Sequence, residues 1–146
     1  MISKFFRWFG AVVAAIVAAM ALLSAVELFS AVVHPFPPDS PQTYEAMCAH
    51  VANYPQWVLA AVVPMWAATA YLSTWIAGRL GGRGCAVFVA VLLLSAVMYN
   101  LSMLPYPLLF KVAQLIAIVV AVVAAYRLLR PKEMNHEDTK DTKGIN

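Results

Sequence analysis

Five polar side chains stand inside or at the ends of long apolar stretches of this sequence. They are Glu27, His34, Asn100, Lys111 and Gln114. Ionisable residues within apolar segments are costly in lipid, so they usually pair with one another or serve a function. A carboxylate can bind a cation, a histidine titrates near neutral pH, and an amide both donates and accepts hydrogen bonds. We expect these five side chains to form one polar cluster within the membrane.

Helical spacing predicts how these side chains approach one another. Glu27 precedes His34 by seven residues, so the two share a helix face with Ser30. Counting ~1.5 Å per residue places Glu27 roughly 9 Å and Lys111 roughly 5 Å inside the ends of their apolar segments. Gln114 follows Lys111 at i+3, on the same face. The cluster is therefore expected at one depth, near one end of the helices.

Three interpretations of the cluster remain open at this point. In the first, Glu27 titrates or binds a cation in a functional site that opens outward. In the second, Glu27 and Lys111 form an ion pair that fixes helix register, while Asn100 and Gln114 complete its hydrogen bonds. In the third, Lys111 only extends its ammonium group to the membrane surface.

No metal site, cofactor site or catalytic residue is predicted. Glu45, Cys48 and His50 lie close together in the sequence, and thiolate and imidazole suit zinc or copper. On a helix, however, Glu45 and Cys48 share a face and His50 points elsewhere. We expect Cys48 and Cys85 on opposite sides of the bilayer, too far apart for a disulfide. No nucleophile–base pair or phosphate-binding glycine loop is present, so an enzyme is the less favoured class.

The composition requires a lipid environment for most of the chain. Of 146 residues, 63% are hydrophobic and only 12% are charged, against about 45–50% and about 25% in soluble domains. This balance excludes a water-soluble globule, a disordered chain and a nucleic-acid-binding module. About 20 apolar residues are needed to cross a bilayer as a helix. Four segments meet this length, at about 8–33, 57–78, 85–104 and 108–126.

The basic residues predict the orientation of these four spans. The ends that we assign to the cytoplasm carry seven basic residues: Lys4, Arg7, Arg79, Arg83, Arg127, Arg130 and Lys132. The other two connections hold only Lys111. The positive-inside rule then places both termini in the cytoplasm, as expected for a multi-pass protein of a bacterial inner membrane. The first apolar run is too long for the core of a cleaved signal peptide.

The expected fold is an all-α, four-helix transmembrane bundle within a single domain, 1–131. Prolines open the outer connection, 34–56, and Ser40 followed by Pro41 predicts a short helix at about 41–53. The tail, 132–146, is polar and is expected to be disordered. Small residues at i+4 spacing predict close helix packing; such rows are Ala11, Ala15 and Ala19, then Ala70, Thr74 and Gly78, and Ala113, Ala117, Ala121 and Ala125.

Short motifs resemble those of an uncharacterised group of small bacterial four-helix membrane proteins. The similarity covers most of 8–127 and rests on ELFS at 27–30, HPFPP at 34–38, AGRLGGR at 77–83 and LPYPLLF at 104–110. The resemblance implies the four-span topology and no particular reaction. Small four-helix drug exporters also carry a glutamate in their first helix, but Glu27 lies near a helix end and the outer connection is long.

The sequence favours a non-enzymatic role in the membrane. The expectation is a small integral component whose outer segment or helix faces contact a membrane-protein partner or a second copy. The alternative is an oligomeric carrier of ions or small molecules in which Glu27 is the coupling carboxylate. The bilayer is the expected environment, and no nucleic acid is expected to bind.

Overall fold

A computed structural model describes residues 2–129 of the chain. Within this range the chain forms five α-helices and no strands. The predicted tail at 132–146 lies outside the described residues. The helices are α1 (Ile2–Val33), α2 (Tyr44–Ala52), α3 (Gln56–Gly81), α4 (Arg83–Met103) and α5 (Leu108–Leu128).

Four of the helices, α1, α3, α4 and α5, are long and apolar enough to cross a membrane. The shortest of them has 21 residues, which gives a length of about 30 Å at 1.5 Å per residue. Large apolar side chains remain exposed along all four, for example Phe9, Leu72, Val91 and Val120. An apolar surface of this kind suits lipid and not water. The all-helical, multi-pass character that the sequence predicts is therefore found.

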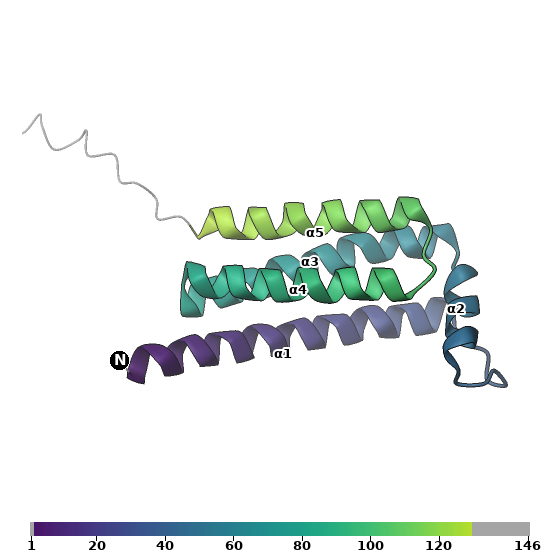
Figure 1. Cartoon of the computed structure of the whole chain (residues 1–146), viewed down its shortest axis with the longest axis horizontal. Helices are drawn as coiled ribbons and strands as arrows, with labels where there is room; N and C mark the ends of the chain where they lie inside the picture. The colour runs from purple at the N-terminus through teal and green to yellow at the C-terminus, as the bar shows by residue number, and fades with distance from the viewer. Residues whose placement is uncertain (1, 130–146) are drawn as a thin grey trace, which may run out of the picture.

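The central helix of the assembly is α3. It packs against α1, α4 and α5, whereas α4 has smaller contacts with α1 and α5, and α1 does not contact α5. The four long helices alternate in direction, and α2 stands across one end of them (Figure 1). We call this the α2 end; there α1 and α4 finish and α3 and α5 begin. The first and last described residues both lie at the opposite end (Figure 1).

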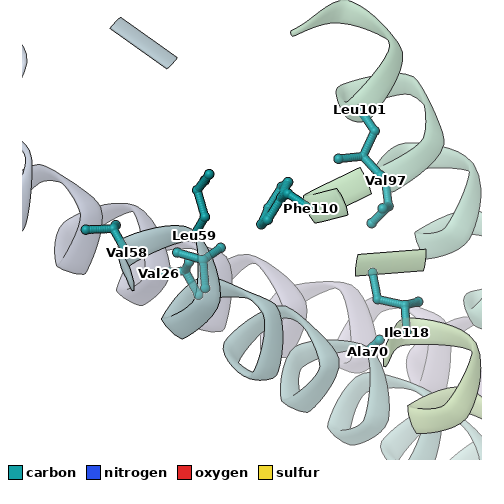
Figure 2. Packing of buried hydrophobic residues seen from close by; sticks show 9 residues of the cluster. Val26, Val58, Leu59, Ala70, Val97, Leu101, Phe110 and Ile118 are labelled. Carbon is teal, nitrogen blue, oxygen red and sulfur yellow. The ribbon is translucent and has the colours of Figure 1, made fainter. Parts of the chain in front are cut away.

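Two clusters of buried residues hold these helices together. The larger joins all four long helices and contains Val26, Leu59, Leu101 and Phe110. Figure 2 shows the Phe110 ring of α5 pointing toward Leu59 of α3, with Val97 and Leu101 of α4 on the other side of Phe110. Inside a bilayer the hydrophobic effect adds little to helix association, so these contacts stabilise the helix assembly mainly through close packing.

The smaller cluster lies toward the opposite end and depends on small side chains. Ala11 and Ala15 of α1 pack with Ala77 of α3 and Cys85 of α4. The predicted row Ala11, Ala15 and Ala19 is buried, and so is the row Ala70, Thr74 and Gly78. Ala11, Ala15 and Ala77 thus let α1, α3 and α4 approach closely at this end. The row of Ala70, Thr74 and Gly78 faces α5 instead, since Ala70 belongs to the larger cluster with Ile118 and a Cβ on Gly78 would meet Leu129.

The short helix in the outer connection begins later than the sequence predicts. The expected N-cap was Ser40, but the helix starts at Tyr44 and its N-cap is Thr43, whose hydroxyl accepts a hydrogen bond from the Ala46 amide at 3.3 Å. The Ser40 amide instead donates to the Pro37 carbonyl at 3.1 Å, closing a turn. The chain is thus in a turn at Ser40, and Thr43 caps the helix in place of Ser40.

Candidate functional site

A cavity of about 560 Å³ opens among the helices at the α2 end. All four long helices contribute to its wall, together with α2 and the residues that follow α1, α2 and α4. Trp66 of α3 and Phe110 of α5 supply apolar surface. The polar lining consists of Glu27, Ser30, His34, His50, Tyr54, Asn100, Tyr106 and Gln114.

Four of the five predicted cluster residues line this cavity. Glu27 and His34 come from α1 and its end, Asn100 from α4 and Gln114 from α5. The α1 residues share a face because the helix continues beyond Val33, where the His34 amide donates to the Ser30 carbonyl at 2.8 Å. Helical spacing was thus sufficient to bring these groups together.

The fifth predicted residue, Lys111, does not line the cavity. At about 100° per residue, Gln114 lies about 40° from Phe110 and about 60° on the other side from Lys111. The cavity-facing arc of α5 contains Phe110 and Gln114, so Lys111 falls beside it and is half-buried. The backbones of α1 and α5 do not pack directly against each other, so Glu27 and Lys111 stand on helices that are separated by the rest of the assembly.

Gln114 is the buried polar residue of the site. It is 1% exposed, and neither its Nε2 nor its Oε1 has a hydrogen-bond partner among residues 2–129. A buried polar group without a partner costs about 1–3 kcal/mol. Since the amide lines the cavity, water or a bound molecule there can supply both missing partners.

Aromatic rings gather where α2 meets the cavity. The His34 and His50 rings stack with centroids 4.5 Å apart, and the Tyr54 ring lies 4.7 Å from His34 and 5.3 Å from His50. The Phe36 ring lies 4.8 Å from His50. His34 Nε2 is buried without a hydrogen-bond partner. We call His34, Phe36, His50 and Tyr54 the aromatic cluster; it forms one wall of the cavity.

The surroundings of this cluster favour uncharged side chains. Burial lowers the pKa of His50, and repulsion from His34 lowers it further, against a smaller opposing effect of the His34 backbone. Burial also raises the pKa of Tyr106 to about 12, with a lesser contribution from Tyr54. At neutral pH, His50 is therefore a neutral imidazole and Tyr106 a neutral hydrogen-bonding phenol.

A second, smaller cavity of about 290 Å³ shares part of this wall. Glu27, Trp66 and Asn100 line both cavities. The second cavity extends toward Thr69 and Leu93, deeper along α3 and α4. Glu27 and Asn100 therefore lie where the two cavities adjoin.

Several cavity residues were not expected from the sequence. The sequence indicates His50 only as a possible metal ligand. It does not predict that Tyr54, Trp66 and Tyr106 join the polar cluster. The aromatic residue between the two prolines at 105 and 107 was one available signal, because that short connection must lie at the end of two spans. For Trp66, a large aromatic in mid-span, the sequence offered no comparable indication.

The cavity lining contains hydrogen-bonding groups and aromatic rings. Among residues 2–129, no group of three His, Cys, Asp or Glu side chains could hold a metal ion. Cys48 and Cys85 are free thiols. The lining offers one carboxylate, two amides, two phenols, one aliphatic hydroxyl and aromatic surface, and these groups can form hydrogen bonds and stacking contacts.

The sequence matches no protein-family model, no curated protein and no solved structure. The resemblance carried by the short motifs therefore stays a prediction.

Proposed function

We propose that this chain is a non-enzymatic component of a bacterial inner membrane that binds a small polar ligand in the cavity at the α2 end. The buried Gln114 amide, with both polar atoms unpartnered at the cavity wall, carries this proposal. A group left in that state lowers stability, and such costs are commonly kept where a ligand is bound.

The cavity fits a small molecule in size and in chemistry. Ligand sites usually measure about 300–1,000 Å³ and combine apolar walls with a few polar groups, and this cavity has about 560 Å³. A ligand with both a donor and an acceptor would satisfy both polar atoms of the Gln114 amide. Glu27 adds an acceptor for a donor or a cation, and the stacked rings of the aromatic cluster add a flat apolar wall.

The experiment compares small molecules that co-purify with the protein. Wild type, Gln114→Leu and the control Gln56→Leu are purified in detergent, and the released small molecules are identified by mass spectrometry. Gln56 is exposed at the start of α3 and does not line this cavity. The proposal requires a stoichiometric molecule in wild type and Gln56→Leu that is lost from folded Gln114→Leu. Retention of that molecule in Gln114→Leu, or no bound molecule in wild type, contradicts it.

The proposed architecture is a four-helix transmembrane bundle with both termini in the cytoplasm. It is supported by the four long apolar helices, by the basic residues at the end opposite α2 and by both described ends lying there. In this orientation α2 and Cys48 face the periplasm. Cys48 is half-buried, whereas Cys85 is buried among α1, α3 and α4.

The native thiols allow a direct test of that orientation. A membrane-impermeant maleimide added to intact spheroplasts should label the wild type and Cys85→Ala, but not Cys48→Ala. Labelling that appears only after the membrane is broken would reverse the orientation.

Ion-coupled transport is the second candidate function. Glu27 and Asn100 line both cavities, so a cation or proton held at Glu27 is positioned between two spaces. If the co-purified molecule is transported, its uptake into proteoliposomes should depend on an imposed proton or cation gradient. Glu27→Gln should abolish that dependence and Glu45→Gln should not, because Glu45 lies on α2 and does not line either cavity. Uptake by Glu27→Gln at the wild-type rate excludes this function.

A further inference from the structure

A groove of about 500 Å³ runs between α4 and α5 at the end opposite α2, with Thr74 of α3 in its floor. We propose that it binds one anionic phospholipid, whose acyl chain lies along the groove and whose phosphate contacts Arg127. This site is independent of the polar cavity, and neither proposal requires the other.

The walls of the groove are two apolar helix faces with matching periodicity. On α4 they are formed by Ala86, Val87, Ala90, Val91 and Leu94, and on α5 by residues from Ile118 to Arg127. Each set recurs at i and i+4, which keeps it on one helix face. Ala86 and Ala90 are small, so the α4 wall leaves room between the helices.

The length of the groove matches one leaflet. Eight residues separate Ala86 from Leu94, and nine separate Ile118 from Arg127, which corresponds to about 12–14 Å at 1.5 Å per residue. Half of a hydrocarbon core is about 15 Å thick. The groove therefore extends from the membrane surface to about the bilayer centre, the depth that an acyl chain of one leaflet occupies.

The groove ends at polar groups of the kind that a phospholipid requires. Arg127 and Tyr126 line the end of the groove that lies at the membrane surface. Thr74 of α3 lies in the floor with 0% exposure, and its hydroxyl has no hydrogen-bond partner in the described part of the chain. Thr74 and Arg127 lie 18 and 19 residues from the starts of their helices. Since α3 and α5 run in the same direction, the two residues are at similar depth. The hydroxyl is thus near the headgroup level, where it can donate a hydrogen bond to an ester carbonyl.

The charge at this end favours an anionic headgroup. Arg127 can form a charge-assisted, two-pronged contact with a phosphate. In the described range, the carboxylates are Glu27, Asp39 and Glu45, all toward the α2 end. Basic pockets between transmembrane helices bind anionic headgroups in this way. Of the neighbouring arginines, Arg79 lies over the Trp75 ring at 5.5 Å and does not line the groove.

Native mass spectrometry of the full chain in detergent tests the proposal. The probes are phosphatidylglycerol and phosphatidylcholine with identical acyl chains. One phosphatidylglycerol should bind about tenfold more tightly than phosphatidylcholine, a difference of about 1.4 kcal/mol. Arg127→Gln should reduce phosphatidylglycerol binding to the phosphatidylcholine level. Arg79→Gln, the charge-matched control, should leave the preference unchanged.

Two valine substitutions test whether the acyl chain lies in the groove. Val123 lines the groove, so Val123→Phe should fill it. Val120, three residues earlier on α5, does not line the groove, so Val120→Phe should leave it open. Both valines are exposed, at 42% and 61%, so both variants should fold. Binding of both lipids should fall in Val123→Phe and persist in Val120→Phe; Val119→Phe, also in the groove, serves if Val123→Phe is unstable. Equal binding of the two lipids by wild type, or equal losses in Arg79→Gln and Arg127→Gln, overturns the proposal.

Discussion

The imidazole rings of His34 and His50 stack with centroids 4.5 Å apart and planes 18° apart. His34 continues the α1 helix by one residue, and His50 belongs to α2. The stack therefore holds α2 against the end of α1, beside the cavity that both rings line. Protonation of His50 would place a charge in this half-buried stack, so the attachment depends on pH.

We expect the attachment of α2 to weaken in mild acid. The pKa of His50 is lowered from its ordinary value of 6.5 by burial and by repulsion from His34. The folded state then binds fewer protons than the unfolded state below pH 6.5, so stability is complete above that pH and falls as the pH drops toward the folded-state pKa. The thermal midpoint of the detergent-solubilised protein should fall from pH 7.5 to pH 5.5.

His50→Phe supplies the control for this pH dependence. Phenylalanine keeps an aromatic ring beside His34, Phe36 and Tyr54 but cannot be protonated. The variant should show a smaller fall of its thermal midpoint over the same range. An identical fall in wild type and His50→Phe would assign the pH effect to other groups.

A hydrogen bond also ties α2 to the helix assembly. The Tyr44 hydroxyl donates to the Met103 carbonyl at the end of α4. Tyr44→Phe removes this bond, whose net contribution is about 0.5–1.5 kcal/mol. Amide hydrogen exchange should accelerate in α2 and remain unchanged in the middle of α3. Tyr71→Phe also removes a tyrosine hydroxyl, but on α3 and far from α2. This control should leave the exchange rates in α2 as in wild type.

The sequence was informative wherever one local rule decided the structure. The apolar runs located the four long helices, and the face shared by Glu27, Ser30 and His34 followed from helical spacing, because α1 is regular through His34. The burial of Ala11 and Ala15 likewise followed from the small-residue rows.

The sequence was less informative where two local rules competed or where tertiary packing decided. Ser40 and Thr43 are both good N-caps, and the turn closed by Ser40 on Pro37 left Thr43 to begin α2. Lys111 and Gln114 are neighbours on α5, but the rotation of that helix against α3 brought only Gln114 to the cavity. The central position of α3 depends on all the helix contacts together, which no single segment encodes.

Gly81 allows three helices to meet closely, which gives a third prediction. A Cβ at position 81 would lie 2.8 Å from Ala11 Cβ and 2.7 Å from Cys85 Sγ. Gly81→Ala should therefore lower the free energy of unfolding by about 1–3 kcal/mol through overpacking, measured by unfolding in mixed micelles. Gly84→Ala is the matched control, since a Cβ at position 84 has no neighbour within 4 Å. Equal stabilities of the two variants would show that the contact at Gly81 relaxes freely.

The unpartnered Gln114 amide gives the last prediction, which concerns stability without ligand. In the empty protein both amide atoms lack a protein partner, and leucine at this position removes that cost while retaining a similar volume. Gln114→Leu should therefore raise the unfolding free energy of ligand-free protein by about 1 kcal/mol. Gln56→Leu, at an exposed position, should change it by less than about 0.5 kcal/mol. If Gln114→Leu instead destabilises the ligand-free protein, the Gln114 amide already has hydrogen-bond partners. The proposal that this amide binds a ligand would then fail.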